Sequence, residues 1–132
     1  MGKFIYTSLY RIFELHDFVL TISWEWGLPW IIDKGAIEKV INLVQNDEYY
    51  PTFYEKISYL LYGLVMNHWF ADGNKRTSLV ATAGFIWDNT HDILLTEKFL
   101  KEFENVVVDV ASRKTSKEEL THLVKLFLFS CL

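Results

Sequence analysis

Residues 51–88, PTFYEKISYLLYGLVMNHWFADGNKRTSLVATAGFIWD, contain two apolar helical segments joined by a short polar turn. In the first segment, apolar residues recur at helical spacing from Pro51 to about His68 and cover most of its surface. Pro51 suits the first helical position, where a missing N–H costs nothing. In the second segment, from about Asn74 to Asp88, small residues would let neighbouring helices approach closely. The pattern predicts two central, buried helices on either side of the turn.

The rest of the chain predicts four further helices. Apolar periodicity with the caps Thr7 and Asp33 indicates helices at about 7–24 and 33–44, and turn signals at 89–92 and 113–115 precede helices at about 97–111 and 116–131. A short β element is expected, if anywhere, in the tryptophan-rich loop before residue 33 or at Ile93–Leu95. The sequence therefore predicts a single all-α domain over residues 1–132 with about six helices.

Glycine and proline interrupt the helical pattern between the first two predicted helices. Gly27 frees the backbone, and Pro29 lacks a donor and biases Leu28 away from helical geometry. We expect a loop or a short hairpin here. Trp26 and Trp30 either pack on the first helix or form a surface that grips another protein.

The composition is typical of a globular protein that folds without disulfide bonds. The chain has 132 residues, of which 51% are hydrophobic and 23% charged. Its only cysteine, Cys131, excludes an intrachain disulfide and a thiolate metal cluster. No apolar run approaches the length of a membrane span, and the net charge of -4 works against nucleic-acid binding. The sequence predicts a soluble, cytoplasmic protein with neither a membrane nor a nucleic-acid partner.

The turn between the central helices concentrates groups that suit phosphoryl-type transfer. Gly73 allows a sharp turn, and the free N–H groups at the start of the next helix attract anions. Lys75 and Arg76 would add positive charge for nucleotide phosphates. Asp72 beside them suits Mg²⁺, which takes carboxylate and phosphate oxygens. His68 could accept a proton from an attacking hydroxyl.

Each of these residues also has an ordinary structural interpretation. A histidine at a helix end is often a cap, and an Asp-Gly-Asn sequence is a common turn. Adjacent cations at a helix start are commonly just solvated. Only the combination within one short stretch indicates catalysis.

The same stretch resembles the Fic/Doc family motif, His-x-Phe-x-acid-Gly-Asn followed by basic residues. The chain contains it as His68, Phe70, Asp72, Gly73, Asn74, Lys75 and Arg76. Weaker similarity covers nearly the whole chain, at His16-Asp17, Gly27-Leu28-Pro29, Asp33, Tyr50-Pro51-Thr52 and Asn67. The resemblance implies a compact all-α Fic fold with a target-binding flap at about residues 25–33.

The resemblance also implies a role for each motif residue. His68 would be the general base, Asp72 would hold Mg²⁺, and Phe70 would be a buried anchor of the loop. Asn74 and its neighbouring backbone would cradle phosphate. The flap would contact the target protein through Gly27, Leu28, Pro29 and Trp30.

Two positions favour the Doc-like branch of the family. Members that transfer AMP have Gly-Asn-Gly-Arg and a second arginine three residues later, whereas here Lys75 replaces the second glycine and Leu79 the second arginine. Members of the Doc-like branch differ from the AMP-transferring members at the same two positions. There the resemblance implies transfer of the terminal phosphate of ATP to a protein such as translation elongation factor Tu, by a toxin that a partner antitoxin neutralises. Transfer of AMP or another nucleotidyl group, and a catalytically silent binding module, are the alternatives.

The C-terminal run Val124–Phe129 is strongly apolar. It is expected to form the last core helix, and the alternative is an apolar edge that docks a partner. No segment resembles the family's inhibitory helix, so control is expected from another polypeptide.

Overall fold

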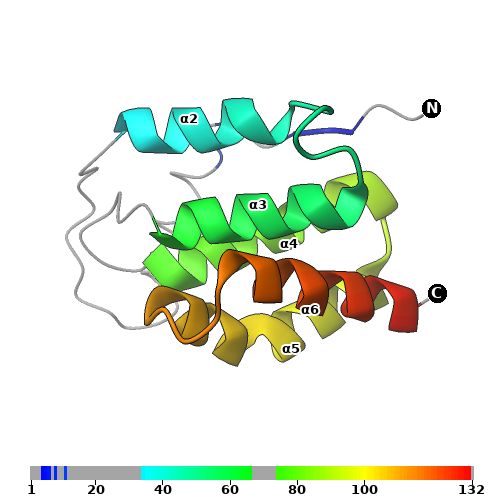
Figure 1. Cartoon of the computed structure of the whole chain (residues 1–132). Coiled ribbons are helices and arrows are strands. Elements are labelled where there is room, and N and C mark those ends of the chain that lie inside the picture. Colours follow the sequence, from blue (N-terminus) through cyan, green and yellow to red (C-terminus); the bar gives the residue numbers. More distant parts are fainter. Residues whose placement is uncertain (1–3, 7, 9–10, 12–33, 67–73, 132) are drawn as a thin grey trace.

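Helices make up all the regular structure in the residues that the computed structural model describes, which are 4–6, 8, 11, 34–66 and 74–131 (Figure 1). Apart from residues 8 and 11, the predicted helix at 7–24 lies outside these ranges, and so does the flap at about 25–33. The described helices carry the labels of Figure 1: α2 (Lys34–Val44), α3 (Phe53–Met66), α4 (Asn74–Thr90), α5 (Ile93–Ala111) and α6 (Lys117–Ser130). The all-α prediction is confirmed for this part of the chain.

Helix α3 lies at the centre of the bundle and contacts each of the other four helices (Figure 1). Successive helices run antiparallel, because the connections between α2 and α3, α4 and α5, and α5 and α6 are short. The buried apolar residues of α3 are Ile57, Leu60, Leu61, Leu64 and Val65. Burial of each of these side chains contributes about 1.5–3 kcal/mol. The predicted central position of this helix is therefore confirmed.

Helix α4 is the second buried helix, as the sequence predicts. Its small residues Ala81 and Ala83 are buried between neighbouring helices, and it contacts both α3 and α5. On the far side of the core, the rings of Phe99 and Phe103 stack with their centroids 4.6 Å apart, and Phe127 of α6 meets both edge-on. These rings close the core between α5 and α6, so the C-terminal run forms a core helix.

Side-chain caps determine where three of the helices begin. Thr52 accepts a hydrogen bond at the start of α3, and Asp92 Oδ1 accepts one from the Leu95 N–H at 3.0 Å at the start of α5. At α6, Ser116 Oγ accepts from the Glu119 N–H while the Glu119 carboxylate accepts from the Ser116 N–H. Each such cap stabilises a helix by roughly 1 kcal/mol.

The observed helix boundaries differ from several of the predicted ones. The Asp92 cap starts α5 at Ile93, so the β element expected at 93–95 is wrong and the start predicted near Glu97 is one turn late. Helix α3 begins at Phe53, two residues after Pro51, because Thr52 takes the capping position. Helix α4 also continues beyond the predicted end, to Thr90.

A missing side chain lets α2 approach α3 closely. A Cβ atom built on Gly63 would lie 2.9 Å from Cγ2 of Val40, closer than real Cβ atoms approach another carbon. Val40 is buried and sits where the side chain of any other residue at position 63 would be. Gly63 therefore sets both the spacing and the register of α2 on α3.

A fully buried lysine joins three parts of the bundle. Lys56 Nζ donates hydrogen bonds to the carbonyl oxygen of Val44, at 3.0 Å, and to Oδ1 of Asp47, at 2.8 Å. The same ammonium group lies 5.7 and 5.6 Å from the ring centroids of Phe4 and Tyr6. Its charge is thus compensated by a carbonyl, a carboxylate and two aromatic faces.

The N-terminal segment packs against α4 through an asparagine side chain. Asn89 Oδ1 accepts from the Ile5 N–H at 2.7 Å, and Asn89 Nδ2 donates to the Ile5 carbonyl at 2.9 Å. Beside this pair, the ring of Phe4 stacks on Phe53 with centroids 5.2 Å apart. The asparagine amide satisfies the backbone of this segment much as a neighbouring strand would.

Candidate functional site

The predicted phosphate-binding site falls at the start of α4. Asn74 is the first residue of this helix, as the sequence predicts. In Figure 1 this helix start lies at the end of the bundle where α3 ends. The first N–H groups of a helix lack intrahelical acceptors and carry the positive end of its dipole, so the start of α4 can bind an anion.

Several predicted site residues cannot be placed from the described residues. His68, Asp72 and Gly73 lie outside them. So do the flap residues Gly27, Leu28, Pro29 and Trp30. The catalytic, metal-binding and target-binding roles assigned to these residues therefore stay predictions.

Two cations stand in the first turn of α4. Lys75 and Arg76 are both exposed, and this turn contains no acidic residue. Lys75 forms no ion pair with any residue in the described part of the chain. Their charges add to the helix dipole, so the donor set fits the phosphate chain of a nucleotide.

Most side chains in the next two turns of α4 are buried. Leu79 is only 7% exposed and belongs to the hydrophobic core. The position that would hold a second phosphate-binding arginine is therefore filled by an uncharged side chain that packs in the interior. Only the identity of this residue was predictable from the sequence, because its burial depends on how α4 packs.

Thr77 is a residue of this site that the sequence analysis missed. Its side chain is fully buried, and its Oγ1 has no hydrogen-bond partner among the residues that the structure describes. A buried hydroxyl without a partner costs about 1–3 kcal/mol, so Thr77 is a costly feature of the helix that carries the candidate site. The only signal in the sequence is a hydroxyl residue directly after two cations, which is too common to be specific.

Within the described ranges, no three His, Cys, Asp or Glu side chains gather closely enough to hold a metal ion. Asp72, the predicted Mg²⁺ ligand, lies outside those ranges. None of the described helices has the length and apolar character needed to cross a membrane.

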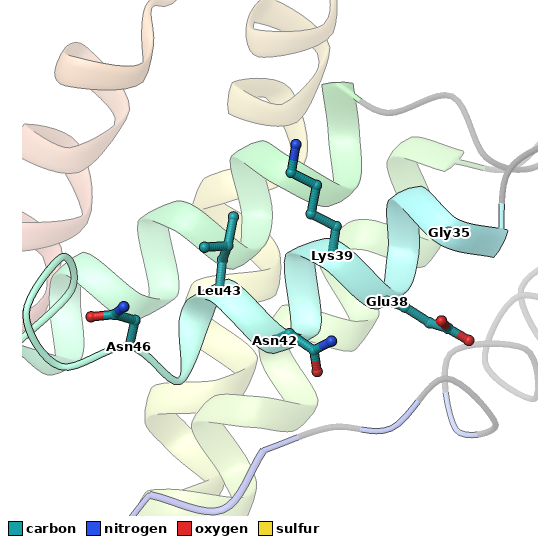
Figure 2. A pocket seen from close by; sticks show the side chains of 6 residues that line it. All are labelled: Gly35, Glu38, Lys39, Asn42, Leu43 and Asn46. Carbon is teal, nitrogen blue, oxygen red and sulfur yellow. The ribbon is translucent and has the colours of Figure 1, made fainter.

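An open depression of about 480 Å³ lies along α2 (Figure 2). The residues that line it come from one face of α2 and from the second residue after the helix. They are Gly35, Glu38, Lys39, Asn42, Leu43 and Asn46. Because the lining comes from one helix face with no second element opposite it, we assign no function to this depression.

A protein-family model described as the Fic/DOC family matches residues 6–86. The chain belongs to the Fic/DOC family. The matched segment includes α2, α3 and most of α4, and so contains the motif and both helices that flank it. Helices α5 and α6 of this Fic/DOC protein lie beyond the match, yet both pack on α3. Comparison with curated proteins found no significant match.

Family membership indicates the general activity. Fic/DOC proteins are typically transferases that use nucleotides, so the family assigns this chain to nucleotidyl or phosphoryl transfer onto proteins. The cationic start of α4 is consistent with such a donor. Which group is transferred depends on details of the site that the family as a whole does not share.

Proposed function

We propose that this Fic/DOC protein is a Doc-like kinase, which transfers the terminal phosphate of ATP to a hydroxyl group of a target protein. The observation that carries the proposal is the pair of side chains at positions 75 and 79. Lys75 is an exposed cation at the start of α4, and Leu79 is buried and uncharged. The site thus has a charge where AMP-transferring members have a glycine, and lacks one where they have an arginine.

This exchange should change how the nucleotide is seated. A glycine would let the phosphate chain approach the backbone closely, whereas the Lys75 side chain obstructs that approach and supplies a cation of its own. Position 79 has no arginine, so the side chain that would bind the terminal phosphate when the nucleotide is oriented for AMP transfer is missing. Both changes favour an orientation that presents the terminal phosphate to the acceptor.

The proposed roles of the remaining residues follow the family motif. His68 takes the proton of the acceptor hydroxyl, and Asp72 holds Mg²⁺, which would neutralise phosphate charge. Gly73, Asn74 and Arg76 bind the phosphates together with the first N–H groups of α4. The flap at about residues 25–33, with Gly27, Leu28, Pro29 and Trp30, holds the target.

In the cell, we propose that the protein is a toxin and that a partner antitoxin protein neutralises it. The proposed target is a translation elongation factor such as elongation factor Tu. Expression of the chain alone should then arrest growth, and expression of the His68→Ala variant should not. Harmless expression of the unaltered chain would contradict the toxin role without excluding the transferase activity.

The transferred group can be identified with two isotopic labels. Purified protein is incubated with Mg²⁺, a bacterial lysate and ATP labelled at either the α- or the γ-phosphate. We expect the γ-label to reach protein, and His68→Ala to abolish the transfer. Lys75→Gly, which restores the glycine of AMP-transferring members, should reduce γ-transfer. Transfer of the α-label by the unaltered protein would refute kinase activity and identify a nucleotidyl transferase.

A further inference from the structure

The end of α5 and the start of α6 lie at the same end of the bundle as the start of α4 (Figure 1). Helices α4 and α5 contact each other and are joined by a connection of only two residues, 91–92. With 17 and 19 residues, they extend about 26 and about 29 Å from that connection. The end of α5 is therefore level with the start of α4 along the bundle, so the turn from α5 into α6 lies at the same end of the bundle as the candidate site.

The turn from α5 into α6 presents two cations to solvent. Arg113 and Lys114 are exposed, and neither forms an ion pair with a residue in the described ranges. The backbone holds the turn in place, because the N–H groups of Lys114 and Thr115 both donate to the carbonyl of Asp109, at 2.8 and 3.1 Å. Arg113 adopts a positive φ of 65° at the end of α5. The two charges are thus displayed on an ordered turn.

Nearby acidic groups compensate this charge only in part. The Glu119 carboxylate accepts the Ser116 N–H in the cap of α6. The Nζ atom of Lys117, in the first turn of α6, lies 5.5 and 5.4 Å from the ring centroids of Tyr50 and Tyr59. Residues 109–119 contain three cations (Arg113, Lys114 and Lys117) and three carboxylates (Asp109, Glu118 and Glu119), and Lys75 at the start of α4 adds a further cation without an ion pair among the described residues. Among these described residues positive charges outnumber negative ones by one, although the whole chain carries a net charge of -4.

We infer that Arg113 and Lys114 form a docking surface for an acidic segment of the protein substrate. This inference rests on the proposed function, because it concerns how that substrate reaches the site. A protein ligand fits better than nucleic acid, since two free cations neutralise few phosphates and nucleic-acid surfaces usually track several along a groove. Complementary charge at the rim of a site mainly steers and positions a partner.

The binding test uses a short fluorescein-labelled peptide of alternating glutamate and glycine, with fluorescence anisotropy as the readout. The variant is Arg113→Glu/Lys114→Glu, and the matched control is Lys98→Glu/Lys101→Glu, which reverses two exposed cations of α5 away from the turn. We expect the variant to weaken binding about tenfold at low ionic strength, the control about twofold or less, and salt to weaken binding by the unaltered protein.

A second measurement separates docking from catalysis. The Arg113→Glu/Lys114→Glu variant should require more lysate protein to reach the same transfer of labelled phosphate, whereas its thermal stabilisation by ATP and Mg²⁺ should equal that of the unaltered protein. If the unaltered protein shows no such stabilisation, the proposed function fails while peptide binding can still be observed. An unfolding midpoint close to that of the unaltered protein would show that the variant is folded.

Three results would overturn the inference. They are absence of peptide binding by the unaltered protein, equal binding by the variant and the unaltered protein, and equal losses in the variant and the control. A single-stranded oligonucleotide provides the remaining comparison. If it binds more tightly than the peptide at physiological ionic strength and the same variant abolishes this binding, the surface belongs to nucleic acid.

Discussion

Replacing Lys56 with methionine should lower the free energy of unfolding by about 1–3 kcal/mol, although it removes a buried charge. The methionine side chain fills nearly the same space but cannot donate a hydrogen bond. The carbonyl of Val44, at the end of α2, would then lose the bond that Lys56 Nζ makes in the interior. The orphaned carbonyl dominates the expected loss, because a buried acceptor without a partner cannot regain its hydrogen bond from water.

The partner carboxylate contributes much less. The side chain of Asp47 is 81% exposed, whereas that of Lys56 is fully buried, so water solvates the carboxylate once the ammonium is gone. We therefore expect Asp47→Asn to lower stability by less than about 1 kcal/mol. Lys56→Ala should be the most damaging change, at about 3–5 kcal/mol, because it also leaves a cavity beneath Phe4 and Tyr6.

Urea unfolding followed by tryptophan fluorescence and circular dichroism measures all three variants. The expected order of destabilisation is Lys56→Ala, then Lys56→Met, then Asp47→Asn. A Lys56→Met protein as stable as the unaltered one would refute the reasoning, since it would show that the Val44 carbonyl does not need the ammonium group. Asp47→Asn as damaging as Lys56→Met would instead assign the effect to the ion pair.

Three further predictions concern other parts of the fold. Asn89→Ala should speed hydrogen exchange at the Ile5 N–H at least about tenfold, whereas Asn89→Asp, which keeps the acceptor, should retain most of the protection. Burial, and to a smaller extent the neighbouring Tyr50, raises the pKa of Tyr59. Its neutral form therefore stabilises the fold at pH values below the ordinary pKa of 10.0, and this stabilisation is lost as pH rises through the raised pKa. Tyr59→Phe should reduce this loss of stability at alkaline pH in unfolding measured as a function of pH. Ser116→Ala should lower unfolding free energy by about 1 kcal/mol. Hydrogen bonds from the backbone and side chain of Ser116 lower the pKa of Glu119, so the Glu119 carboxylate stabilises the fold at pH values above the ordinary pKa of 4.5. This stabilisation is lost as pH falls through the lowered pKa, and the loss should be smaller in Ser116→Ala.

Helix identity followed from local patterns that the structure confirms. Apolar spacing identified α2 to α6, and the turn signal at residues 113–115 placed the start of the last helix near Ser116, which the structure shows to be its cap. The start of α5 was missed because Ile93, Leu94 and Leu95 read as a short β segment. The structure shows that the first two are exposed and that the Asp92 carboxylate caps the helix there, so a local hydrogen bond outweighs the apolar run.

Contacts between distant parts of the chain could not be predicted. A lysine is normally a surface residue, and the burial of Lys56 depends on a carbonyl and a carboxylate that only the packing of α2 on α3 brings to it. The pairing of Asn89 with Ile5 spans 84 positions and leaves no periodic signal. At the candidate site, the residue types at the start of α4 were evident, whereas the burial of Thr77 and Leu79 depends on tertiary packing.

The contact between Gly63 and Val40 has a consequence for the flap. Helix α2 begins at Lys34, directly after the segment proposed to hold the target, so the position of α2 on α3 is also the point from which that segment is tethered. A methyl group at position 63 would push Val40 outward and shift the start of α2 relative to α3, the helix that precedes the family motif. A single hydrogen atom in place of a side chain thus fixes the position on α3 of the helix that follows the segment proposed to hold the target.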